Sequence, residues 1–178
     1  PSENYLQQAD SVALEAFEEQ IASLKESGYE IRRTDLFASI EEIAERHRRL
    51  NCAERSLAQH ARYEEYTDLY PAIVEDDILE GREISVGELA ELRSTQIDRR
   101  AAVSETMERE GVDVWISPTA PGPAPEGLDW TGDPSMNVPW SRTGVPVVSI
   151  PAGQSPEGLP LGLRCGAGFG EDERLLAW

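Results

Sequence analysis

Residues 112–153 read VDVWISPTAPGPAPEGLDWTGDPSMNVPWSRTGVPVVSIPAG, and this stretch decides the fold class. It begins with a mostly apolar run that ends at Pro118, and a second such run, VPVVSI, covers 145–150. Short apolar runs bounded by proline and glycine are typical of strands buried on both faces. The stretch therefore predicts two interior strands joined by a long irregular loop.

The residues on either side of this stretch predict helices that cover the strands. A third apolar run, LPLGLRC, lies at 159–165, and a short amphipathic pattern follows at 171–178. Residues 1–111 show mainly helical spacing, whereas 112–178 hold the strands, the loop and the start of a last helix. We therefore expect an α/β layered fold, with a mixed sheet covered by helices, over residues 1–178.

Three helices are expected before residue 112. The first spans 11–27 and is stopped by Gly28, and an alternating segment, 29–33, predicts a short strand. Ser39 with Glu42, and Ser85 with Glu88, form capping-box patterns that open two longer helices. The expected inner faces of these two helices contain Ile40, Ile43, Ala44, His47, Leu50, Leu57 and Ala58, and Val86, Leu89, Ala90, Ile97, Ala101 and Met107.

The charge balance excludes some classes of partner. The 178 residues carry 16 basic and 34 acidic side chains, a net charge of −18, with Lys25 as the one lysine. Such a chain should repel a polyphosphate backbone, so we expect no nucleic-acid partner. No apolar run reaches the roughly 20 residues of a membrane helix. The acidity fits either a high-salt cytoplasm or an acidic protein from a GC-rich genome.

Common catalytic and metal-binding patterns are absent from the sequence. His47 and His60 lie thirteen positions apart, unlike a zinc pair on a helix, and His47 is expected to be a core or rim residue. Cys52 and His60 would lie about 80° apart around an ideal helix, which disfavours a nucleophile–base pair. Two cysteines make no disulfide framework, so we expect a reducing, cytoplasmic location. We predict no metal site and no cofactor.

The loop between the first two strands is the best candidate for a ligand pocket. Trp130, Met136 and Trp140 could form an apolar wall, with Asp133 and Asn137 as polar groups, although the same residues could instead cap a core. The glycine-rich loop at 166–170 precedes three carboxylates, which would repel a phosphate, so we interpret it as a packing loop.

At this loop the sequence resembles the C-terminal part of the amidase signature family. The resemblance rests on Asp113–Thr119 with Ala124-Pro125, on Thr131–Asp133, and on Trp140–Pro146 with Ser149–Gly153. Gly158–Gly162, Asp172 and Leu175-Leu176 complete it, and residues 1–112 follow the family more loosely.

The resemblance implies hydrolysis of an amide, or transfer of its nitrogen, by a serine nucleophile that a second serine and a lysine activate. The family carries these residues in its N-terminal half, and this chain has no Ser-Ser pair, so no catalytic residue is transferred to it. By position, the residues expected to bind substrate are Asp133, Met136, Asn137 and Trp140. Asp133 is an approximate match to the acidic glutamine-binding residue of the amidotransferase members.

Three interpretations of function remain open. The first is the C-terminal portion of a cytoplasmic amidase that hydrolyses a carboxamide to an acid and ammonia or an amine, inactive alone. The expected partners are a small amide, the N-terminal half of the same protein and, through exposed strands, a second copy. The second interpretation is a non-catalytic binding or structural module of the same fold. The third is part of a glutamine amidotransferase subunit.

Overall fold

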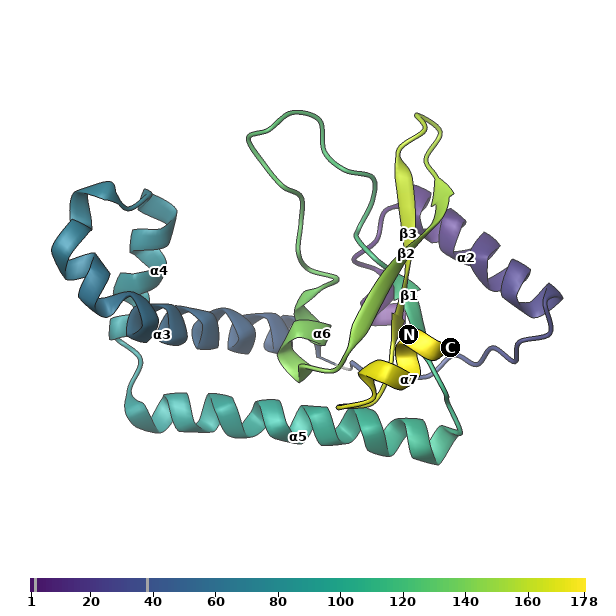
Figure 1. Ribbon diagram of the computed structural model, residues 1–178, viewed down its shortest axis with the longest axis horizontal. Coiled ribbons are helices and arrows are strands. Elements are labelled where there is room, and N and C mark those ends of the chain that lie inside the picture. Colours follow the sequence, from purple (N-terminus) through teal and green to yellow (C-terminus); the bar gives the residue numbers. More distant parts are fainter. Residues whose placement is uncertain (2, 38) are drawn as a thin grey trace. The chain divides into compact units, whose positions relative to one another are not determined.

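The computed structural model describes residues 1, 3–37 and 39–178, which form two compact units (Figure 1). The first unit contains Pro1–Ile40 and Arg99–Trp178, and the second contains Glu41–Asp98. The long helices α3 (Ile40–Tyr66) and α5 (Val86–Glu110) each run through a boundary between the units.

The first unit is built on a three-stranded antiparallel sheet in the order β1-β3-β2. Its strands are β1 (Trp115–Pro118), β2 (Val147–Gln154) and β3 (Pro160–Gly166). Cys165 of β3 pairs with Ile116 of β1 and with Val148 of β2, and a bulge lies between Pro151 and Gly153. The three apolar runs thus form strands as predicted. The prediction of a mixed sheet was wrong for the described residues, since each of their strand pairings is antiparallel.

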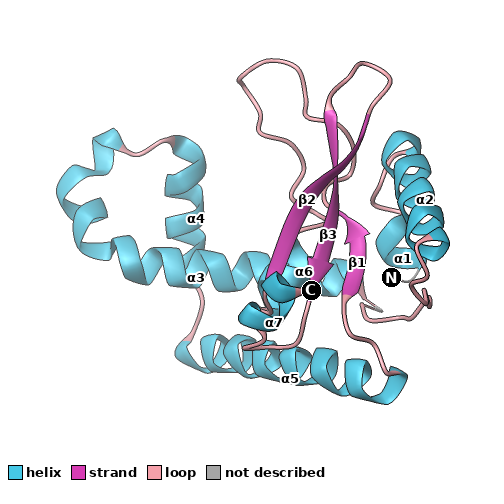
Figure 2. Cartoon of the chain, turned by 45° about the vertical axis from the view of Figure 1, so that its right-hand side comes forward, coloured by secondary structure: helices cyan, strands magenta, loops and turns pink. Residues whose placement is uncertain are grey.

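Short and long helices surround this sheet. Helix α1 (Glu3–Leu6) precedes α2 (Ser11–Glu26), which packs against the strands (Figure 2). Asp10 caps α2 by accepting a hydrogen bond from the backbone N–H of Ala13 at 2.8 Å. Helix α6 (Val138–Thr143) precedes β2, and α7 (Asp172–Ala177) follows β3.

The second unit is helical and has its own small core. It consists of α3 from Glu41 onward, a 3₁₀ turn (Thr67–Leu69), α4 (Ala72–Arg82) and α5 as far as Asp98. Helices α3 and α4 approach closely at Gly81, where a Cβ atom would lie 2.0 Å from the Cys52 carbonyl oxygen. The buried side chains of this unit are Ile43, Leu50, Cys52, Ala53, Ser56, Tyr63, Ile78 and Leu92.

Both capping-box patterns predicted helix starts correctly. Helix α3 begins directly after Ser39, and in α5 the Ser85 hydroxyl oxygen accepts a bond from the Glu88 backbone N–H at 3.1 Å. Gly28 and Gly111, which follow α2 and α5, have the positive φ angles of 92° and 63° that favour glycine.

Three other expectations were wrong. Residues 29–33 form no strand, because this exposed segment has no ladder partner among the described residues. Strand β2 is largely exposed and not covered on both faces, whereas β1, at the opposite edge of the same sheet, is mostly buried. The expected inner faces hold for Ile43, Leu50 and Met107, but the following residues are exposed: Ala44, Leu57, Ala58, Val86, Ala90, Ile97 and Ala101.

Candidate functional site

A cavity of about 830 Å³ lies in the first unit, beside the long loop that joins β1 to α6. The loop and the β2–β3 hairpin extend from the same end of the sheet (Figures 1 and 2). Three parts of the chain line the cavity: residues 8–10, 13, 16 and 20 before and within α2, residues 118–125, 130–134 and 137 at the loop, and residues 160–162 of β3. Most of the lining is proline, alanine and glycine, with Trp130 as the large aromatic side chain.

The start of α2 is tied to the first part of the loop. The Asp10 backbone N–H donates to the Pro121 carbonyl oxygen at 2.7 Å, while the Asp10 side chain caps the helix. Gly122 packs so closely against this carboxylate that a Cβ atom there would lie 2.1 Å from Asp10 Oδ2. Prolines at 118, 121, 123 and 125 restrict the same segment, so ordering it costs little conformational entropy.

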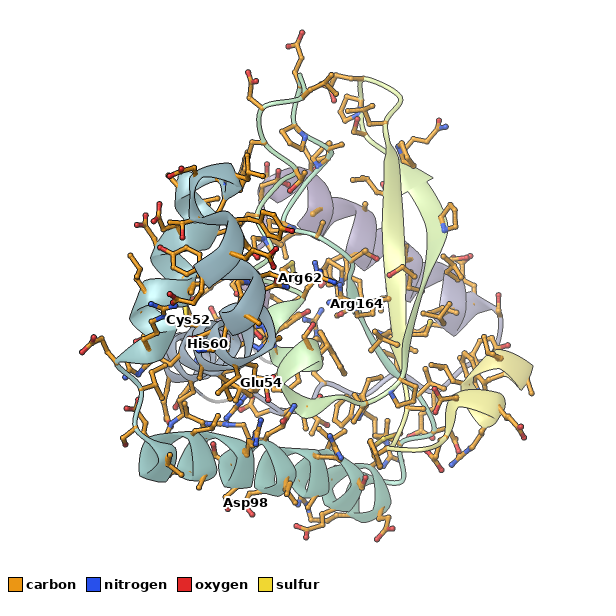
Figure 3. The ribbon with its side chains drawn as sticks, turned by 60° about the vertical axis from the view of Figure 1, so that its left-hand side comes forward. Cys52, Glu54, His60, Arg62, Asp98 and Arg164 are labelled. Atoms are coloured by element: carbon orange, nitrogen blue, oxygen red, sulfur yellow. The ribbon has the colours of Figure 1, made fainter. Side chains whose placement is uncertain are left out.

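Arg164 of β3, labelled in Figure 3, holds the two ends of the loop together. Its Nη1 atom donates to the Met136 carbonyl oxygen at 2.5 Å and to the Tyr5 hydroxyl at 3.3 Å. Its Nη2 atom donates to the Thr119 carbonyl oxygen at 2.7 Å and to Asn137 Oδ1. One guanidinium thus fixes Thr119 and Asn137, which both line the cavity.

This arginine is unusual because it is buried and, within the part of the chain that the structure describes, pairs with no carboxylate. Arg164 is 2% exposed, and its guanidinium donates to carbonyl, amide and hydroxyl oxygens. Burial lowers the pKa of Arg164 from its ordinary value, and burial likewise raises the pKa of Tyr5. Several oriented dipoles therefore replace the hydration of this cation.

The structure divides the predicted pocket residues into two groups. Trp130, Asp133 and Asn137 line the cavity, and Trp130 is 60% exposed. Met136 and Trp140 are buried in the core, where Trp140 packs edge-on against Phe37 with ring centroids 5.1 Å apart. Met136 contributes its carbonyl oxygen to the arginine cluster, whereas its side chain does not line the cavity.

Two further polar groups at the cavity have no hydrogen-bond partner among the described residues. They are Thr119 Oγ1 and Gln20 Oε1, both buried atoms. The Gln20 Nε2 atom donates to the Ala152 carbonyl oxygen at 3.1 Å, which ties α2 to β2. Sequence reasoning missed Gln20, Thr119 and Arg164, although a lone arginine in an apolar strand was a visible signal.

The reactive side chains of α3 do not belong to the cavity lining. Cys52, Glu54, His60 and Arg62 come from α3 (Figure 3), where Cys52 is buried and His60 is exposed. Burial and the nearby Asp77 raise the pKa of the Cys52 thiol, which disfavours the reactive thiolate. The described residues hold no cluster of three side chains suited to a metal ion.

The glycine-rich turn before α7 is a packing loop, as predicted. Glu171 accepts a hydrogen bond from the Gly168 backbone N–H at 3.0 Å and pairs with Arg174 at 2.8 Å. The carboxylate therefore occupies the position that a phosphate would need. As for membranes, none of the helices within the described ranges is both long and apolar enough to cross one.

The sequence profile of the Amidase family matches residues 2–176, almost the whole chain. The chain belongs to the amidase family. This confirms the resemblance found in the loop and strands at 113–176. Trp130, Asp133 and Asn137 therefore lie in a cavity of an amidase-family fold.

Curated relatives of this amidase-family chain are glutamyl-tRNA(Gln) amidotransferase A subunits. That of Gluconobacter oxydans is 40% identical over 75 residues, which cover 38% of this chain and 15% of that protein. That of Oceanobacillus iheyensis is 42% identical over 62 residues, covering 31% of this chain and 13% of that protein. The matched region is thus a small part of these relatives' length.

Solved amidase structures share the fold over nearly the full chain. An amidase crystal structure matches with a TM-score of 0.85 at 23% identity, over 98% of this chain and 42% of that one. A fatty acid amide hydrolase matches with a TM-score of 0.76 at 19% identity, over 95% of this chain and 36% of that one. The chain therefore spans less than half of the length of these enzymes.

Proposed function

We propose that this chain forms the C-terminal part of an amidase that hydrolyses a carboxamide C–N bond to an acid and ammonia or an amine. The observation that carries the proposal is the match of the Amidase family profile to residues 2–176. The chain contributes the sheet, the long loop and the cavity at Trp130, Asp133 and Asn137, which binds part of the substrate.

The nucleophile in this proposal comes from the preceding part of the same protein. The family's serine–serine–lysine group has no counterpart in this sequence, which contains no Ser-Ser pair. Activation of a serine by a base is what makes amide attack possible, and removal of a single oxyanion-hole donor already lowers the rate by about 10²–10³. The 178 residues alone should therefore give no turnover.

The test compares the full-length natural protein with the 178-residue chain on a panel of carboxamides, with release of ammonia or amine as the readout. We expect turnover by the full-length protein, its loss after treatment with a serine-directed reagent, and no rate above buffer for the 178-residue chain. Turnover by the short chain that the reagent abolishes would contradict the proposal that the nucleophile lies in the preceding part of the protein. A full-length protein without turnover, yet with its fold intact, would favour the binding-module interpretation.

The curated relatives support a second candidate, a glutamine amidotransferase subunit. The supporting observation is the 40% identity to an amidotransferase A subunit, together with Asp133 at the cavity. Adding L-glutamine to the panel separates the two candidates. Glutamine hydrolysis that is faster than hydrolysis of simple carboxamides would favour the amidotransferase. Glutamine hydrolysis that is no faster than that of simple carboxamides would favour the amidase.

A further inference from the structure

Asn137 is oriented by a group that can only donate hydrogen bonds. A guanidinium has no acceptor, so the side-chain atom of Asn137 that meets Arg164 Nη2 is the carbonyl oxygen Oδ1. The amide nitrogen Nδ2 therefore points away from the arginine. Because Asn137 lines the cavity and its residue is exposed, this nitrogen is available to a ligand there.

Arg164 also fixes the backbone of Thr119. The same Nη2 atom that meets Asn137 also donates to the Thr119 carbonyl oxygen at 2.7 Å. The Thr119 backbone N–H donates in turn to the Gly162 carbonyl oxygen at 3.2 Å, which fixes this residue to β3. Its hydroxyl Oγ1 has no partner within residues 1, 3–37 and 39–178, but this atom is buried against Gly162, so Asn137 Nδ2 is the donor that a ligand in the cavity can reach.

The charges around the cavity limit the class of ligand. The ionisable side chains in its lining are Asp10 and Asp133, and no arginine, lysine or histidine of the described chain joins them. Two carboxylates in the lining, with the Arg164 guanidinium behind it already bonded to protein oxygens, disfavour an anionic ligand. The rest of the lining is apolar or uncharged.

We propose that Asn137 Nδ2 forms a subsite that hydrogen-bonds an uncharged oxygen, a ketone or hydroxyl, on the otherwise apolar chain of the substrate. Arg164 is the positioning residue of this subsite, because its Nη2 atom bonds Asn137 Oδ1 and so directs Nδ2 away from the arginine. The inference rests on the proposed amidase function and adds a substrate class to it: neutral amides with a second oxygen group, in preference to amides with a carboxylate.

The test uses the full-length protein and four substrates of similar length. They are hexanamide, 4-oxohexanamide, 5-oxohexanamide and the monoamide of adipic acid. We expect at least one ketone to exceed hexanamide in kcat/KM, and the adipic acid monoamide to be the poorest substrate. A preference for the adipic acid monoamide would overturn the proposed ligand class.

Asn137→Asp tests the donor directly, because it replaces Nδ2 by a carboxylate oxygen of the same size. We expect the ketone-to-hexanamide ratio of kcat/KM to fall about tenfold, the effect of one hydrogen bond. Asn51→Asp, an exposed asparagine on α3, is the matched control and should leave the ratio unchanged. An unchanged ratio in Asn137→Asp would overturn the subsite.

Arg164→Lys tests the positioning role, because a lysine ammonium cannot reproduce the fixed, planar set of N–H donors of the guanidinium. We expect KM for the preferred ketone to rise while kcat stays close to that of the unmodified protein. A purely structural role would instead lower the melting temperature and the rates for all four substrates alike. If Arg164→Lys does not fold, Asn137→Asp still decides the proposal.

Failure of the amidase function is separable from failure of the subsite. If the full-length protein hydrolyses neither these four amides nor the carboxamide panel, the proposed function fails. Calorimetric titration with 5-oxohexanamide, 4-oxohexanamide and hexanamide then tests the subsite by binding alone. Tighter binding of a ketone that Asn137→Asp abolishes supports the subsite, and equal binding of all three overturns it.

Discussion

Trp140 donates a hydrogen bond from its indole Nε1 to the hydroxyl of Tyr5 at 2.8 Å, across 135 positions of sequence. The Tyr5 hydroxyl in turn donates a hydrogen bond to the Met136 carbonyl oxygen at 2.8 Å. The first helix of the chain is thereby connected to the loop that lines the cavity. The two rings are also packed edge to face, with centroids 6.4 Å apart.

Replacing Tyr5 by phenylalanine should destabilise the chain. The change keeps the ring but leaves the Trp140 N–H and one bond of Arg164 without their acceptor in a buried place. An unsatisfied buried polar group costs about 1–3 kcal/mol, so we expect a loss of that size in urea unfolding followed by circular dichroism. Tyr29→Phe, at an exposed tyrosine, is the control and should shift stability by less than about 0.5 kcal/mol. Equal effects of the two variants would contradict the buried network.

The same tyrosine should make the protein sensitive to alkali. Burial raises the pKa of Tyr5, so the unfolded chain loses this proton near pH 10 while the folded chain still holds it. The unfolded state then binds fewer protons, and stability falls as pH rises above about 10. Unfolding free energies measured from pH 8 to 11 should fall more steeply for the natural sequence than for Tyr5→Phe. Parallel curves would show that Tyr5 does not contribute.

Gly81 provides a test of packing in the second unit. Its missing side chain lets α4 approach α3, and a Cβ atom would lie 2.0 Å from the Cys52 carbonyl oxygen and 2.7 Å from Ser56 Cβ. Because the first of these is backbone, Gly81→Ala should force the helices apart and cost about 1–3 kcal/mol or more. The readout is thermal unfolding followed by helical circular dichroism.

Gly87→Ala is the matched control for this substitution. Gly87 lies in α5 with no atom closer than 3.9 Å to the new Cβ position, so alanine should stabilise the helix by up to about 1 kcal/mol. The two alanine substitutions thus have opposite expected signs. A neutral or stabilising Gly81→Ala would show that the α3–α4 crossing is looser than described.

Local signals in the sequence were sufficient to place most helices and strands. Ser85 and Glu88 marked the start of α5, and the apolar run at 159–165 became the central strand β3. The buried face of α5 could not be predicted in this way. This helix carries apolar residues on two sides, and Leu92 and Val103 are buried about a third of a turn from the exposed Val86 and Ile97. Spacing identifies both stripes but does not say which one meets the rest of the chain.

The candidate site was predictable in part for a similar reason. Loop composition pointed to Asp133 and Asn137 at a pocket, and the structure places both in the cavity lining. Met136 at the end of the loop and Trp140 in α6 are buried instead, with Arg164 bonded to the Met136 carbonyl oxygen and Tyr5 to the Trp140 indole. The partners of Arg164 lie 27 to 159 positions away along the chain, and no local pattern encodes such long-range hydrogen bonds.

The free edge of β2 should make the 178-residue chain associate with itself. Within the described residues β2 pairs with β3 along one side, and Val147 and Ile150 are 42% and 45% exposed. An unpaired edge strand with apolar side chains is a template for pairing with another strand. Sedimentation should therefore show a weight-average mass above 19.7 kDa that rises with concentration.

Ile150→Lys should reduce this association, because a charge on an edge strand opposes pairing between two copies. Leu128→Lys adds the same charge at a fully exposed loop position and should leave the association unchanged. In the full-length protein we propose that a preceding segment covers this edge, so neither variant should change its mass. A monomeric 178-residue chain with high thermal stability would contradict the proposal that β2 needs a partner.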